Sequence, residues 1–211
     1  GLGVIWRKSA IVLPVPVWIG DVIMGMSTLF FLFFLASYLI KLMARPKVLL
    51  EDMKTPPARA GISAIGMAIM LLAAIFLNFG WSLAWLWWIG VVVQILVMAL
   101  VLYLLQQGPP ELHTINPFQY LTFVGLIVAP IAGVPLGYGQ VSFWLAMSAL
   151  VGFVVITIGY GAKIIRVRPP QPLRPSLAII LSPLSLFALM FLPMQAEMAF
   201  QIFYWLSWVT A

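Results

Sequence analysis

Cysteine is absent from this sequence of 211 residues, and charged residues make up only 8% of it. Without cysteine, these residues can form no disulfide and no thiolate metal site. The single histidine, His113, excludes a bis-histidine haem, and we expect neither a metal nor another cofactor. A composition this poor in charge is not that of a soluble globular domain.

Ionisable residues are also missing from the interiors of the long apolar runs. Carboxylates within a membrane usually mark proton relays and ion-coupled pumps, so their absence favours a channel or facilitator. Asp21, near one end of its run, is the closest exception, and we interpret it as an interface residue. Glu111 and His113 lie two residues apart but have no nucleophile or third ligand nearby, so we predict that this protein is not an enzyme.

Hydrophobic residues account for 64% of the sequence, and its mean hydropathy is +1.13. A helix needs about 20 apolar residues to cross a bilayer, whereas spanning strands alternate in polarity, which these runs do not. We therefore predict an all-α integral membrane protein, a bundle of helical hairpins. The predicted helices are 17–40, 57–77, 84–105, 117–137, 142–162 and 174–193, with partial helices at 1–6 and 200–211.

The apolar stretches at the two ends of the sequence are shorter than a membrane span. We interpret each as part of a helix, and we expect residues 1–211 to form a single transmembrane domain that is truncated at both ends.

Basic residues collect in two of the predicted loops. These two loops follow the second and the sixth predicted helices, so they lie on the same side of the membrane. The loops around 78–83, 137–141 and 193–199 lie on the other side and contain no lysine or arginine. The positive-inside rule therefore predicts that the basic loops are cytoplasmic, although Arg7 and Lys8 break the pattern. The tryptophans expected at the outer interface are Trp6, Trp18, Trp81, Trp85, Trp87, Trp88 and Trp144. Because this topology explains most of the formal charge of +6, we expect contact with the lipid bilayer and no nucleic-acid partner. The basic loop residues are Lys41, Arg45, Lys47, Lys54, Arg59, Lys163, Arg166, Arg168 and Arg174.

A weak repeat relates the third, fifth and seventh predicted helices. Each has a proline in its first turn, at Pro57, Pro117 and Pro175, which are 60 and 58 residues apart. Proline suits this position because it has no amide hydrogen to lose and its φ is already helical. Eight or nine residues later come Gly66, Gly125 and Pro183, where we expect a helix to bend or unwind.

One interrupted helix in each hairpin suggests a ring whose odd-numbered helices surround a central pore. Three positive helix N-termini would then face the cytoplasmic mouth, together with Lys54, Arg59 and Arg174, and attract anions. Each proline or glycine could equally serve ordinary helix packing, and Gln94 is better explained as an interhelical hydrogen-bond donor than as a substrate ligand.

The segments GLGVIW, WIGDVI, KVLLEDMKTPPARAG, INPFQYL and LRPSLAIILSP, in this order, resemble the family of plant slow anion channels and bacterial tellurite-resistance and C4-dicarboxylate transporters. The resemblance implies a ten-helix protomer with a pore lined by the odd-numbered helices, commonly a homotrimer. Inorganic anions or small dicarboxylates would be its substrates. The gating phenylalanine of that family lies in a ninth helix, which these residues do not include.

We therefore predict a passive anion channel or C4-dicarboxylate facilitator in a bacterial inner membrane. A non-transporting membrane anchor or scaffold subunit is the alternative, in which the small and polar residues would face neighbouring helices instead of a shared axis. Phe118, Thr122 and Gly125 share one helical stripe at spacings of four and three. The candidate pore residues are Gly66, Phe118, Thr122, Gly125, Arg174 and Pro183.

Overall fold

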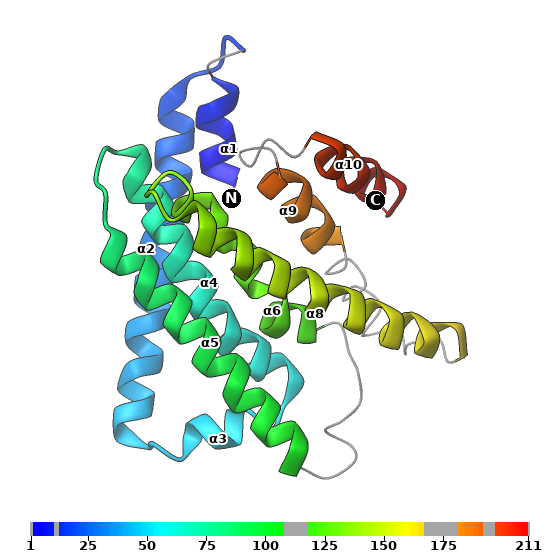
Figure 1. Cartoon of the computed structure of the whole chain (residues 1–211). Coiled ribbons are helices and arrows are strands. Elements are labelled where there is room, and N and C mark those ends of the chain that lie inside the picture. Colours follow the sequence, from blue (N-terminus) through cyan, green and yellow to red (C-terminus); the bar gives the residue numbers. More distant parts are fainter. Residues whose placement is uncertain (1, 11–12, 108–117, 167–180, 192–196, 211) are drawn as a thin grey trace.

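The computed structural model describes residues 2–10, 13–107, 118–166, 181–191 and 197–210, and these are almost entirely helical (Figure 1). His113 and Arg174 lie outside the described residues. In chain order the helices are α1 (Leu2–Ser9), α2 (Val17–Ala44), α3 (Val48–Asp52), α4 (Pro56–Asn78), α5 (Ala84–Gln107), α6 (Gln119–Phe123), the 3-10 helix η2 (Gly125–Val128), α7 (Ala129–Gly133), α8 (Gly139–Arg166), α9 (Leu181–Phe191) and α10 (Glu197–Thr210).

Four of these helices are long and apolar enough to cross a membrane: α2, α4, α5 and the part of α8 from Gly139 to Tyr160. The prediction of an all-α membrane protein is therefore confirmed. The predicted helix boundaries agree to within a few residues for these spans. The short helix α3, in the basic loop between α2 and α4, was not predicted.

The turns between the long helices follow local sequence rules. Pro56 and Pro57 open α4 after Thr55, whose ψ of 129° is extended, because proline disfavours helical geometry in the residue before it. Gly80, with a φ of +84°, reverses the chain between α4 and α5, a conformation that other residues rarely adopt.

The predicted helix 117–137 is not one continuous helix. The α-helical hydrogen bonding of α6 stops at Phe123, the chain continues as the 3-10 helix η2, and α-helical geometry returns in α7. The expected weak point at Gly125 is thus the first residue of the break. Because a 3-10 segment bonds residue i to i+3, it rotates and stretches the chain relative to an α-helix.

At Gly66 the helix does not unwind, because α4 runs without interruption from Pro56 to Asn78. Instead, this glycine lies at a close helix crossing. A Cβ atom at Gly66 would lie 2.9 Å from the backbone nitrogen of Gln94, and one at Gly90 would lie 3.0 Å from the carbonyl oxygen of Gly66. Glycine at this crossing lets the backbones of α4 and α5 touch, as small residues do between membrane helices.

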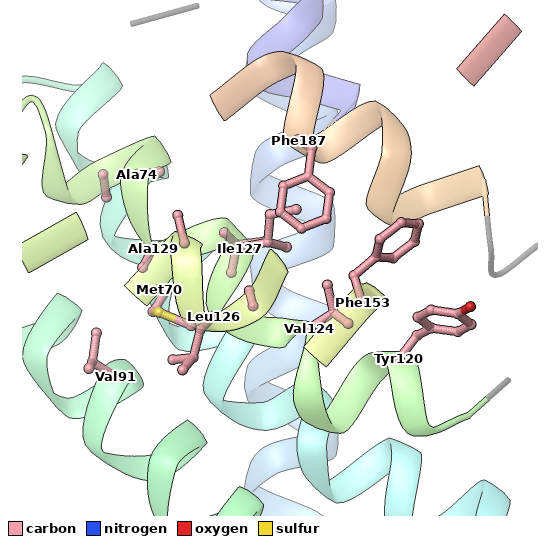
Figure 2. Close-up of a cluster of buried hydrophobic side chains, with 14 of the residues drawn as sticks. Met70, Ala74, Val91, Tyr120, Val124, Leu126, Ile127, Ala129, Phe153 and Phe187 are labelled. Atoms are coloured by element: carbon pink, nitrogen blue, oxygen red, sulfur yellow. The ribbon is translucent and has the colours of Figure 1, made fainter. Parts of the chain in front are cut away.

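The break lies at the centre of the bundle. Leu126, Ile127 and Val128 are all buried, and apolar side chains from α4, α5, α8 and α9 surround them. Figure 2 shows Val91, Phe153 and Phe187, which come from three different helices, around this segment. The broken helix also contacts α4 and α9, so the described parts of the three odd-numbered predicted helices are neighbours.

Six tryptophans were expected at the outer interface alongside Trp87. Trp18, Trp81, Trp85 and Trp144 are exposed, as a lipid-interface position requires. Trp87 is fully buried, so unlike these four it faces the protein interior and not lipid. The other two members of the predicted group, Trp6 and Trp88, are respectively half-buried and exposed.

Arg7, which did not fit the predicted charge distribution, is paired with Asp21. Arg7 Nη1 lies 3.2 Å from Asp21 Oδ1, and the guanidinium lies over the ring of Phe79 at 5.2 Å from its centroid. This neutralising contact explains how a cation occurs at the end of the bundle where the loops otherwise lack basic residues. It also gives Asp21 a structural role at this interface.

Candidate functional site

The end of α6 exposes backbone carbonyl groups inside an apolar bundle, and α5 supplies their partner. Gln94 Nε2 donates to the carbonyl oxygen of Thr122 at 2.9 Å and to that of Leu121 at 3.3 Å. Carbonyl groups in the last turn of a helix have no intrahelical partner. An unpaired group at membrane depth costs several kcal/mol, so the carboxamide makes the break tolerable.

Two glycines make room for this carboxamide. A Cβ atom at Gly66 of α4 would approach Gln94 Oε1 to 2.7 Å, and one at Gly125 of η2 would approach Nε2 to 2.5 Å. Gln94 is itself fully buried. The carboxamide therefore fills a notch between α4 and the broken helix that no residue larger than glycine would leave open.

A second side chain of α5 bonds to the other side of the break. Trp87 Nε1 donates to the carbonyl oxygen of Ala129 at 2.9 Å, and the indole stacks on Tyr138 with ring centroids 5.3 Å apart. Trp87 and Gln94 are seven residues apart, so they lie on one face of α5. This face consequently contacts the broken helix both before and after η2.

A chain of polar groups leads from the break towards the N-terminal end of α4. The hydroxyl groups of Thr122 and Ser63 lie 2.8 Å apart, and Ser63 also donates to the carbonyl oxygen of Arg59 at 2.9 Å. Arg59 is only 3% exposed, and its Nε donates to the carbonyl oxygen of Met53 at 2.9 Å. Among the described residues Arg59 forms no ion pair, so a buried positive charge remains at this end of the bundle.

A small pocket of about 40 Å³ opens where α4, the broken helix and α9 meet. This volume can hold a water-sized molecule but is too small for an organic ligand. Its walls carry no charged side chain among the described residues. The residues that line it are Met67, Tyr120, Leu121, Val124, Gly125, Ile127, Pro183 and Leu186.

The structure divides the predicted pore residues into two groups. Gly125 and Pro183 line this pocket together, although they are far apart in the sequence. Thr122 and Gly66 instead face Ser63 and Gln94, behind the pocket wall. Phe118 is half-buried at the start of α6, and Arg174 lies outside the described residues.

Sequence reasoning missed most of the pocket lining, including Met67, Leu121 and Val124. Leu121 and Val124 each lie one residue from a predicted stripe member, and they line the pocket together with Gly125, which belongs to the stripe. No signal in the sequence separates an apolar side chain that faces a pocket from one that faces lipid. The role of Gln94 as an interhelical donor was, in contrast, predicted and is confirmed.

The chemistry of this site is that of a passage or a packing centre. Among the described residues, no group of three or more histidine, cysteine, aspartate or glutamate side chains could hold a metal ion. The polar groups at the break are amides, hydroxyls and carbonyls, and apart from Gln94 Oε1 those described above bond to one another. Such groups can hold a backbone in place or contact an anion weakly, but they offer no nucleophile activated by a base.

Comparisons with known proteins agree with this description. Over 149 residues the chain is 28% identical to an uncharacterized transporter of Methanocaldococcus jannaschii, a match that covers 67% of this chain and 42% of the relative. The chain thus spans less than half the length of that relative. The profile of the SLAC1 family, described as voltage-dependent anion channel, matches residues 1–211. This multi-pass membrane protein therefore belongs to the SLAC1 voltage-dependent anion channel family, whose members are channels and transporters and not enzymes.

Proposed function

We propose that this chain forms part of the wall of a passive anion pathway, with α4, the broken helix and α9 nearest to the path. Inorganic anions or small dicarboxylates are the proposed substrates. The protein acts in a cell membrane, and as in the resemblance described above, it assembles as a homotrimer. Gly125 and Pro183 lie at the path. Gly66 on α4, Thr122 on α6 and Phe118 just before α6 lie close to it, and Arg174 is proposed from the sequence alone.

The observation that carries this proposal is the break at Gly125–Val128 beside a pocket. Backbone that leaves α-helical geometry at membrane depth is tolerated only where protein buries it or where it lines a cavity. In transporters, interrupted helices near the middle of the membrane commonly form the substrate path. A break of this kind in a chain of an anion channel family supports permeation at the same place.

Charge supports the choice of anions. Arg59 is buried near the start of α4, and Lys54 is exposed two residues before that helix begins. The N-terminus of a helix adds roughly half a positive charge. A desolvated cation beside a helix N-terminus raises the local concentration of anions at this end of the path.

One specific observation favours the alternative, a scaffold subunit that does not transport. Gly66, Thr122 and Gln94 face each other between helices, as the packing hypothesis requires. A scaffold needs no continuous path, however, and its break would serve only to shape a contact surface. The measurement of anion flux distinguishes the two functions.

The full-length protein in a planar bilayer should give anion-selective currents. Under a salt gradient, we expect the reversal potential to move towards the equilibrium potential of chloride or nitrate, because the described interior of the spans offers cations no carboxylate. The measurement is the reversal potential, with a protein-free bilayer as the control. A shift towards the cation potential, or current equal to the control, would contradict the proposal and favour the scaffold.

The distribution of basic loops predicts the orientation. A cysteine in place of Arg45, which is 74% exposed on its side chain, should react with an impermeant thiol reagent only from the cytoplasmic side. A cysteine in place of Gly139, at the start of α8, should react only from outside. The chain has no native cysteine, so each variant reports one position. Labelling of the first variant from outside would reverse the proposed topology.

A further inference from the structure

We propose that Gln94 is a positioning residue of the anion pathway, a residue outside the path that sets the backbone of the path's wall. This inference rests on the proposed function. It assigns to α5, which contributes no residue to the pocket, control over the geometry of a neighbouring helix that does.

The hydrogen bonds of Gln94 lie at the end of α6, next to the break. Gln94 donates hydrogen bonds to the carbonyl oxygens of Leu121 and Thr122. These two residues come just before Phe123, the last residue of α6. Leu121 and Gly125 are both part of the pocket wall. The carboxamide therefore binds the backbone directly behind the surface that a permeating ion would meet.

The carboxamide of Gln94 has one orientation. Its two amide hydrogens point to two carbonyl oxygens, and a flipped amide would place Oε1 against them instead. In the structure Oε1 has no hydrogen-bond partner among the described residues, although it is buried beside Gly66. The protein thus accepts one unpaired buried acceptor in exchange for two paired carbonyl groups.

The surrounding glycines hold the carboxamide of Gln94 in a fixed position. Gly66 of α4 and Gly125 of η2 contact the carboxamide from two sides. The close crossing at Gly90 fixes the position of α5 along α4. Trp87, on the same face of α5, fixes the chain after the break through Ala129. With both sides of η2 attached to one rigid helix, the break has a defined width.

The test is Gln94→Met in the full-length protein, which keeps the length of the side chain but removes both donors. With the carbonyl groups of Leu121 and Thr122 unpaired, we expect a displaced backbone at the break to become the main state and anion flux per folded protein to fall about tenfold. We also expect the nitrate-to-chloride permeability ratio to change, which loss of stability alone would not cause. Amide hydrogen exchange at 121–128 should become faster.

Gln107→Met, the same change at an exposed position of α5, is the matched control and should alter none of these quantities. If Gln94→Met does not fold, Gln94→Asn provides the same comparison, because it fits the notch but is one methylene too short to reach both carbonyl oxygens. Unchanged flux, permeability ratio and exchange in a folded Gln94 variant would overturn the positioning role while wild-type flux upholds the pathway. Absence of wild-type flux would overturn both.

Discussion

Gly125→Leu should destabilise the folded protein by about 1 to 3 kcal/mol, the usual cost of forcing extra methylene groups into a packed interior. A Cβ atom at this position would lie 2.9 Å from Gln94 Cδ and 3.0 Å from Met67 Cγ. The branched side chain must therefore displace the carboxamide and with it both bonds to α6. The measurement is thermal unfolding in detergent, alongside anion flux in liposomes.

Gly25→Leu is the control for this substitution, because Gly25 is exposed on α2 and a Cβ atom there meets nothing within 4 Å. A second comparison uses Gly125→Ala with and without Gln94→Ala. Because removal of the carboxamide vacates the notch, the alanine at 125 should cost less in the double variant than alone. A Gly125→Leu protein with native stability but blocked flux would instead show that the introduced leucine side chain points into an open pore.

Trp87→Ala should produce the largest loss of stability that we expect from a single substitution, about 3 to 5 kcal/mol. The indole is fully buried, stacks on Tyr138 with an angle of 3° between the ring planes, and donates to Ala129. Removing it leaves a cavity and removes the hydrogen bond to the carbonyl oxygen of Ala129 next to the break. The loss is measured as the change in thermal unfolding temperature of the purified protein.

Trp85→Ala controls for the removal of a tryptophan from α5, since Trp85 is 60% exposed and should have a small effect. Trp87→Phe separates the two contributions, because it retains much of the packing but loses the hydrogen bond. We expect it to cost about 1 kcal/mol. Equal stability of the Trp85→Ala and Trp87→Ala proteins would contradict the assignment of Trp87 to the core.

The membrane spans could be predicted from the sequence because their cause is local. A segment of about 20 apolar residues satisfies its own backbone hydrogen bonds as a helix and fits the bilayer. For the same reason the start of α4 at Pro56 and Pro57 was predictable, since proline acts on its own backbone and on the preceding residue. The weakness at Gly125 was also visible, although its 3-10 geometry was not.

The orientation of each helix could not be predicted, because its cause is not local. In water, apolar side chains indicate the buried face of a helix, but lipid is as apolar as leucine and removes this signal. Trp85 and Trp87 are two residues apart in one apolar run, yet one is exposed and the other fully buried. Only the packing of α5 against the broken helix distinguishes them.

Gly66 and Gly125 show the same division between sequence and structure. Both were singled out by their place in a repeat, and both were expected to bend a helix. The sequence determined that neither position carries a side chain. The tertiary structure decided that Gly125 begins the 3-10 segment of a broken helix, whereas Gly66 brings α4 against α5 within a continuous helix. The physical reason is that a glycine permits either outcome, and which one occurs depends on the helices that pack against it in the folded bundle.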